Sequence, residues 1–220
     1  MKLLRSLAPL ALASLALLAS GCASLYYDYL EQVGIPKREV LVNRVMDARE
    51  SQEEAKEQFT DALEEFRSLV SVNDPELEKT YDRLNTEFER SESRADAVRD
   101  RISDIRSVAK RLFAEWEDEI EQYTNSSLRQ QSEQQLRDTQ REYDDLIAAM
   151  ERVADRMDPV LDAFRDQVLF LKHNLNAAAI SSLEGEAAIL EQNVSALIAD
   201  MEASIAEADS FLQRWESTGR

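Results

Sequence analysis

His173 is the only histidine in the sequence, and it lies among Lys172, Asn174 and Asn176 in the segment VLFLKHNLN. A single imidazole needs partners to bind a metal or to relay a proton. A di-metal site in a helical bundle uses Glu-x-x-His pairs, but Phe170 occupies the position of the glutamate. No second histidine is available for zinc. We therefore expect no metal ligands or catalytic residues here. Lys172, His173, Asn174 and Asn176 are interpreted as a hydrogen-bonded structural cluster, with a functional cluster as the alternative.

The acidic run EWEDEIE, residues 115–121, is the second candidate. It could bind a cation or a basic partner. Helical spacing spreads its carboxylates around the helix, so a solvated surface is the alternative. We take Trp116, Glu117, Glu121 and Tyr123 as the candidate partner-binding residues, although the spacing of Trp116 also fits a core position.

Charge excludes one large class of partner. The net charge is −18, and a chain that begins at Cys22 has 24 basic and 44 acidic residues. Such a body repels phosphate backbones, so we expect no nucleic-acid partner. The basic residues at 99, 101, 106, 110 and 111 have acidic neighbours that neutralise them. No glycine-rich phosphate loop and no Ser/His/Asp set is present, so we expect neither an enzyme nor a cofactor.

Cys22 is the only cysteine, and its position is informative. Lys2 and Arg5 precede an apolar run over residues 7–19, and the small residues 19–21 come directly before the thiol. This order predicts a signal peptide over residues 1–21. A cysteine directly after the small residues resembles a bacterial lipobox. We expect acyl chains such as palmitate at Cys22, with an ordinary cleaved signal or an uncleaved anchor as the alternatives.

The anchor also predicts a location. Two or three acyl chains hold a protein firmly on a membrane, so we expect the membrane to be one partner of the chain. Ala23 rather than Asp after the cysteine favours the outer membrane of a Gram-negative cell, with the protein facing the periplasm. Residues 22–36 are interpreted as a membrane-proximal linker. The rings of Tyr26, Tyr27 and Tyr29 fit a membrane interface and fit packing against the body equally well.

The rest of the sequence predicts helices. Positions taken in alternating steps of four and three from Leu77 to Tyr123 are mostly apolar, which is typical of a coiled-coil seam. Equivalent seams run through three other segments, the last of them from Leu183 to Trp215. The first of them is formed by Leu41, Val45, Ala48, Gln52, Ala55, Phe59, Ala62, Phe66 and Leu69. We expect four helices, at about residues 37–71, 77–125, 127–180 and 183–217, with capping boxes at Ser127–Gln130 and Ser181–Glu184. The third seam stays in phase through Pro159, which favours a kinked but continuous helix.

Unequal lengths predict the architecture. Short connections make neighbouring helices antiparallel, and the second and third helices are about 15 residues longer than the others. The sequence therefore predicts one all-α domain over residues 37–217, an elongated antiparallel four-helix coiled-coil bundle with a projecting two-helix arm. The apolar residues 168–171 are expected to be covered on most sides. Seams of this kind can be completed within one chain or by a second copy, so a homo-oligomer stays open.

Several segments carry a family resemblance. The chain resembles an uncharacterised family of proteobacterial helical lipoproteins, a domain-of-unknown-function family. The resemblance rests on Tyr26, Tyr27 and Gly34 and on residues 37–42, 51–59 and 164–176. It covers nearly the whole chain after the signal peptide. It implies a helical, secreted and often lipidated protein, and it supplies no activity.

Together these observations predict a non-enzymatic, outer-membrane-anchored periplasmic lipoprotein. Its role would be structural, interacting or tethering, with an envelope protein as the partner. The alternative is a carrier that binds an apolar ligand or lipid between its helices, which requires a lined internal cavity near Phe170.

Overall fold

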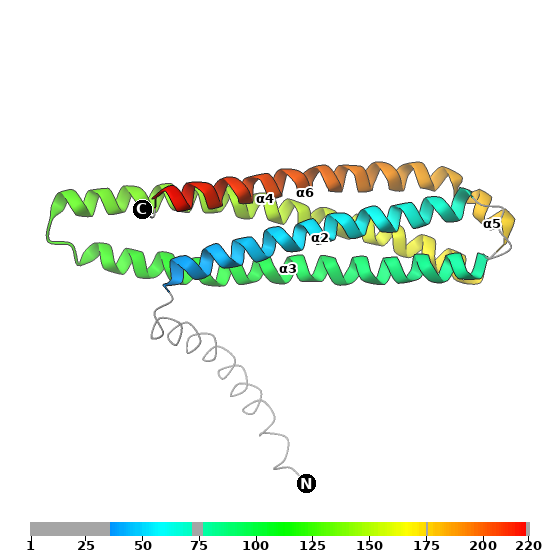
Figure 1. The fold of residues 1–220 in the computed structure, drawn as a ribbon, viewed down its shortest axis with the longest axis horizontal. Coiled ribbons are helices and arrows are strands. Elements are labelled where there is room, and N and C mark those ends of the chain that lie inside the picture. The colour runs from blue at the N-terminus through cyan, green and yellow to red at the C-terminus, as the bar shows by residue number, and fades with distance from the viewer. Residues whose placement is uncertain (1–35, 72–76, 175, 219–220) are drawn as a thin grey trace, which may run out of the picture. The chain divides into compact units, whose positions relative to one another are not determined.

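A computed structural model describes residues 36–71, 77–174 and 176–218. The described chain forms α2 (Lys37–Ser71), α3 (Leu77–Glu121), α4 (Ser126–His173), α5 (Ala177–Ser182) and α6 (Glu184–Thr218). These ranges contain no strand, which confirms the predicted all-α class (Figure 1). The chain divides into two compact units, 1–41 and 42–220, and the second holds nearly all of the described residues. No helix among the described residues combines the length and the apolar character that crossing a membrane requires.

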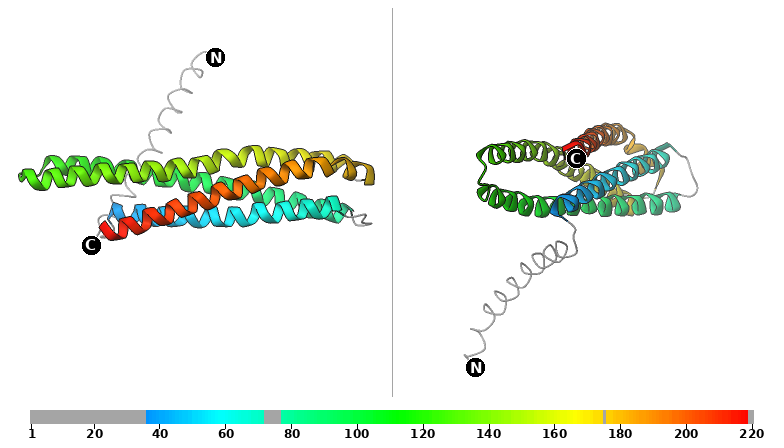
Figure 2. Two further views of the ribbon diagram at one scale, coloured as in Figure 1. Left: turned by 90° about the horizontal axis from the view of Figure 1, so that it is seen from above. Right: turned by 60° about the vertical axis from the view of Figure 1, so that its left-hand side comes forward.

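Side-chain contacts give the order of the helices around the second unit. Gln58 of α2 bonds Glu87 of α3 at 2.7 Å, and Arg156 of α4 pairs with Asp200 of α6 at 2.7 Å. Arg49 of α2 closes the ring by pairing with Asp209 of α6 at 2.5 Å. The closest backbone approaches between long helices are those of α4 with α3 and with α6. The result is an antiparallel four-helix bundle, as predicted (Figure 2).

The core follows the predicted seams. On α2 every predicted seam position from Val45 to Leu69 is buried. Aromatic rings fill the space between opposite helices, because Phe66 of α2 meets Phe164 of α4 edge to face, with 6.4 Å between ring centroids. On α6 the buried series continues from Leu190 to Trp215 in the predicted spacing. Burial of these apolar side chains is the main force that holds the helices together.

The predicted seam of α3 is wrong at both ends. Thr80 is buried while Tyr81 is partly exposed, and Ile120 is buried while Glu119 is exposed. The buried series therefore steps by four residues from Trp116 to Ile120. A straight α-helix drifts relative to a strict seven-residue repeat. Where two helices pack without the rest of the bundle, the buried face can follow that drift.

The boundaries of α4 also differ from prediction. Asn125 is its N-cap, since the Asn125 side-chain oxygen accepts from the backbone N–H groups of Ser127 at 2.9 Å and Leu128 at 3.3 Å. The helix thus begins before Ser127, and the predicted Ser127–Gln130 capping box is wrong. α4 is continuous through Pro159, as predicted. It ends at His173 instead of near residue 180.

A short helix takes the place of the turn expected before α6. The backbone of Asn174 leaves the helical region, and the Asn176 side-chain oxygen then accepts from the N–H of Ala179 at 3.0 Å to start α5. Ser181 lies within α5. The side chains of Ser181 and Glu184, which were predicted to form a capping box, lie outside the described residues. So do Leu175 and residues 22–35 of the predicted linker, including Cys22.

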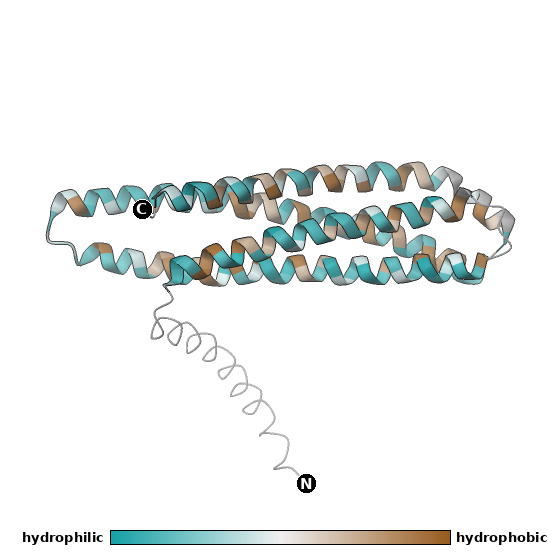
Figure 3. Cartoon of the chain, in the orientation of Figure 1, coloured by the Kyte–Doolittle hydropathy of each residue, from teal (hydrophilic) through white to brown (hydrophobic). Residues whose placement is uncertain are grey.

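The α3–α4 hairpin extends beyond the end of α6. Arg214 in the last turns of α6 pairs with Glu142 of α4 at 3.3 Å. From Glu142 back to the start of α4 at Ser126 is roughly 24 Å of helix at 1.5 Å per residue. We call residues 113–141, which comprise the end of α3, the turn and the start of α4, the arm. The arm was predicted from helix lengths, and hydrophilic residues predominate on it (Figure 3).

Candidate interaction site

The arm is held together by a small apolar cluster of its own. Trp116, Ile120 and Leu136 are buried against one another, with Phe113 packed at their side. The Trp116 indole N–H donates to the Ser132 hydroxyl oxygen at 2.9 Å, which satisfies the one polar atom of the ring. Trp116 is only 9% exposed. The structure thus places this predicted partner-binding residue in the core of the arm, where it supports the surface and does not form it.

A second aromatic pair lies where the arm meets the bundle. The rings of Phe113 and Tyr143 meet edge to face, with centroids 5.3 Å apart and an angle of 77° between their planes. Burial raises the pKa of Tyr143 above its ordinary value of 10. Desolvation disfavours the charged form of a phenol, so this ring favours the neutral state that the packing requires.

The α3 side of the arm carries carboxylates without cationic partners. Glu117, Asp118, Glu119 and Glu121 are exposed, and no Lys or Arg of the described residues pairs with them. The polar contact of this group to α4 is weak, because Gln140 donates to Glu117 at 3.4 Å. In the bundle, by contrast, arginines from neighbouring helices pair with many of the acids. Negative charge is therefore left unneutralised at the arm.

Two large apolar side chains flank the turn at the tip of the arm. Tyr123 is 42% exposed and Leu128 is 49% exposed. Tyr123 was a predicted site residue, and the structure places it just after the end of α3, two residues beyond Glu121. Leu128 was missed, although one signal was available: it is an aliphatic residue two positions after the helix start and off the buried series of α4. The tip thus combines an aromatic ring, an aliphatic side chain and free carboxylates.

Two of the four residues in the predicted cluster around His173 have a structural role. The Asn174 amide donates to the carbonyl oxygen of Phe170 at 2.8 Å, and Asn176 caps α5. These two asparagines shape the turn between α4 and α5. Lys172 and His173 are exposed at the end of α4. Within the described part of the chain, no hydrogen bond links Lys172 or His173 to these two asparagines, so the four residues do not form one hydrogen-bonded cluster.

The prediction that residues 168–171 are covered on most sides is wrong. Val168 and Leu171 are buried, but Leu169 is 54% exposed and Phe170 is 41% exposed. The chain turns into α5 immediately after this point. In this last stretch of α4 only the face that carries Val168 and Leu171 is packed against other helices, and the intervening side chains remain at the surface.

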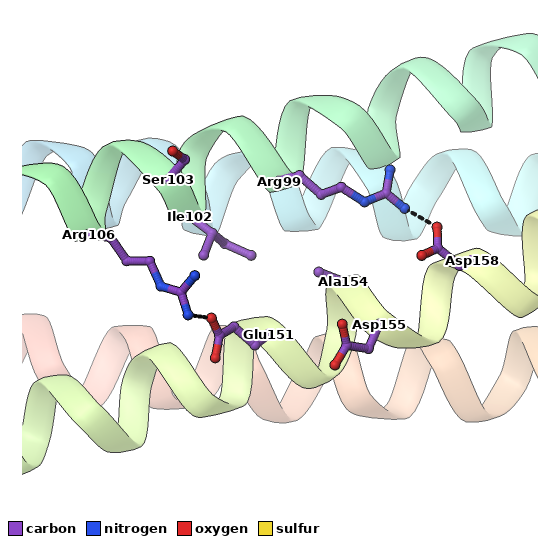
Figure 4. A pocket seen from close by; sticks show the side chains of 8 residues that line it. All are labelled: Arg99, Ile102, Ser103, Arg106, Glu151, Ala154, Asp155 and Asp158. Atoms are coloured by element: carbon purple, nitrogen blue, oxygen red, sulfur yellow. Dashed lines mark hydrogen bonds and ion pairs between the residues drawn. The ribbon is translucent and has the colours of Figure 1, made fainter. Parts of the chain in front are cut away.

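A groove between α3 and α4 encloses about 410 Å³ and is lined mainly by charged groups. Figure 4 shows Arg99 paired with Asp158 and Arg106 paired with Glu151 across it. Arg99 also pairs with Asp96 at 2.8 Å. The predicted neutralisation of this basic cluster is confirmed for these two arginines. Because each guanidinium already has a carboxylate partner, the groove offers little positive charge to an external anion.

The described residues form no group of three or more His, Cys, Asp and Glu side chains that could hold a metal ion. Of the surfaces described, the tip of the arm has the arrangement best suited to binding a macromolecule, because apolar area and unpaired charge lie together there. Large exposed apolar side chains next to charge are typical of protein contact sites.

Comparison with known proteins gives a family without an assigned activity. No curated protein matches the chain, and no solved structure matches it. One family model, described as "Protein of unknown function (DUF2959)", matches residues 26–215, which is most of the sequence. The match includes both helices of the arm, the turn between them and the segment around His173. The chain therefore belongs to the DUF2959 family.

Proposed function

We propose that this protein is a non-enzymatic, lipid-anchored interaction protein of the cell envelope, and that its arm binds a partner protein. The observation that carries the proposal is the tip, where Tyr123 and Leu128 are exposed beside carboxylates that no cation of the described chain neutralises. A partner surface that presents Lys or Arg around a shallow apolar site would complement it. Aromatic anchors contribute strongly to such interfaces.

The arm supports this role through its own packing. Its cluster of Trp116, Ile120 and Leu136 is complete without α2 or α6, and the Trp116–Ser132 hydrogen bond ties its two helices together. A binding site on a rigid element is positioned more accurately than one on a loop. The arm is thus suited to present its tip at a fixed distance from the bundle.

Anchoring at Cys22 on the periplasmic face of the outer membrane is the second half of the proposal, and the sequence before residue 36 supports it. Labelled palmitate should enter the wild-type chain and not Cys22→Ser, and the variant should leave the membrane fraction. Incorporation into Cys22→Ser at the wild-type level would show that another residue carries the lipid.

The carrier role has weaker support than the interaction role. It requires an apolar cavity near Phe170, and the Phe170 ring lies at the protein surface instead. Half of the residues that line the groove between α3 and α4 form ion pairs across it, and an apolar ligand would have to desolvate these charges at a cost.

The arm hypothesis is tested by crosslinking in intact cells. A photo-reactive residue replaces Tyr123, and a control places the same residue at Glu202, an exposed position on α6. We expect a specific protein adduct from position 123 that position 202 does not give. Adducts of the same pattern from both positions, or none from the tip, would contradict a docking role for the arm.

Charge variants give a matched control for that experiment. Changing Glu117, Asp118, Glu119 and Glu121 to their amides should abolish the adduct. Changing four exposed carboxylates of α2 to amides alters the net charge equally and should leave the adduct intact; they are Glu50, Glu57, Asp61 and Glu64. If both variants lose the adduct equally, the effect comes from the net charge of the protein and the arm has no specific role.

A further inference from the structure

Among the described residues, the core of the bundle contains three buried side-chain N and O atoms that have no hydrogen-bond partner in the protein. They are both side-chain amide atoms of Gln52 on α2 and the hydroxyl oxygen of Ser204 on α6. Both residues are fully buried. Ser91 shows the usual solution, since its buried hydroxyl donates to the carbonyl oxygen of Glu87 at 2.8 Å. A buried polar group without a partner is costly, so Gln52 and Ser204 require an explanation.

Gln52 and Ser204 lie at nearly the same level of the bundle. Arg49 pairs with Asp209 and Arg67 with Glu191, and both ion pairs fit a single antiparallel register of α2 against α6. In that register Gln52 is opposite position 206, which puts Ser204 about 3 Å away along the helix axis. Both are seam positions that face the interior. The three unpaired atoms therefore belong to one local site between α2 and α6.

The side chains around this level are small. Ala48 and Ala55 are the neighbouring seam residues on α2, Ala208 is the next on α6, and all three are buried. On α3 the ion pairs of Glu54 with Arg94 and of Glu65 with Arg83 share a register that places buried Ala95 closest to Gln52. The site is thus polar in its centre and lined by methyl groups.

Direct contact cannot satisfy all three atoms. A hydroxyl oxygen can accept from the Gln52 amide N–H, or its proton can bond the amide oxygen, but one hydroxyl position cannot serve both ends of the amide at good geometry. If the Gln52 Nε2 donates to the Ser204 oxygen, the Gln52 Oε1 still needs a donor and the Ser204 proton still needs an acceptor. One molecule that donates and accepts supplies both.

We propose that Gln52 and Ser204 form an internal binding site for one ordered water molecule that links α2 to α6. The water accepts from the Ser204 hydroxyl and donates to Gln52 Oε1. A rotation of the Gln52 side chain then brings its Nε2, which has no partner in the structure, within reach of the Ser204 oxygen. Buried waters take such positions between otherwise unsatisfied groups. The hydrated pair also selects the helix register, because a shift of α6 by one heptad would place the amide against Leu197 or Phe211.

A high-resolution crystal structure of the full chain is the direct test. We expect water density within hydrogen-bond distance of Gln52 Oε1 and Ser204 Oγ. A direct contact between the two side chains without water, or an amide that bonds elsewhere, would overturn the proposal.

A double-mutant cycle tests the shared site in solution. Ser204→Ala alone should raise the unfolding constant about tenfold, because it leaves the Gln52 amide with one partner fewer. Gln52→Leu alone should also raise it, whereas the double variant should lie within about threefold of wild type. If the losses of stability in the two single variants add up in the double variant, the two residues do not share a site and the proposal is refuted. Ser91→Ala is the matched control, and its effect should add to that of Gln52→Leu because its hydroxyl bonds within its own helix.

Discussion

Replacing Trp116 by alanine should unfold the arm and leave the bundle intact. Trp116 is 9% exposed, it forms the arm cluster with Ile120 and Leu136, and its N–H bonds Ser132. Truncating a buried Trp to Ala typically costs about 3–5 kcal/mol. The arm has few other buried side chains, so we expect a loss of about 3 kcal/mol, at the lower end because an exposed hairpin collapses around the gap more easily than a core. A loss of that size lowers the protection of the arm's backbone amides against hydrogen exchange more than a hundredfold.

Hydrogen exchange measured on proteolytic fragments is the assay, because it separates the arm from the rest of the chain. Residues 113–141 should lose protection, while α2 and α6 keep theirs. Trp215→Ala is the matched control: Trp215 is also 9% exposed, and it packs on Phe211 with 5.3 Å between ring centroids. This control should loosen the end of α6. Protection lost throughout the bundle in Trp116→Ala, or retained in the arm, would refute the view that the arm is a separate packing unit.

Three further predictions concern α4 and the turn before it. Tyr143 has a raised pKa, so the folded state holds its proton more tightly than the unfolded state, and stability should fall as pH rises above 10; Tyr143→Phe should flatten that part of the pH–stability curve, and an unchanged slope would rule out this residue as the cause. Asn125→Ala removes the cap of α4 and should cost about 1 kcal/mol in urea unfolding, whereas Ser126→Ala, which leaves the cap oxygen in place, should cost much less. Pro159→Ala restores an N–H for the carbonyl of Asp155 and should raise the melting temperature; a fall in that temperature would mean that the bundle depends on the geometry that proline imposes.

The bundle was predictable because its seams are long and regular. The spacing from Val45 to Leu69 identifies every buried position on that face of α2, since a heptad pattern fixes which side of a helix meets its partners. Even the polar Gln52 was assigned to the seam correctly. The arm followed from the helix lengths, with support from residues 129–142, where Leu136 is the only aliphatic residue. These properties depend on periodicity and chain length, which a sequence displays directly.

Local exceptions were not predictable from the same pattern. Glu119 holds the seam position, but Ile120 is buried because the packing follows apolar area and not strict spacing. Asn125 caps α4 in place of Ser127, so the helix starts two residues earlier than predicted. The four consecutive apolar residues 168–171 predicted that Phe170 would be covered by other helices. Instead α4 ends three residues after Phe170, and its ring lies at the surface. Each error lies where fewer helices pack around the residue. How many helices surround a position depends on the fold and cannot be read from the spacing of apolar residues.

The register between α3 and α4 has a consequence for the length of the arm. The pairs Glu92–Arg165 and Asp158–Arg99 in the bundle and Glu117–Gln140 in the arm all fit one alignment of the two helices. Removing seven residues from each helix would therefore shorten the arm by roughly 10 Å and keep every remaining pair. Removing seven from only one would misalign all pairs beyond the cut. The arm can therefore change its length only when both helices gain or lose the same number of residues. Relatives whose arms differ in length should carry insertions or deletions in both helices together.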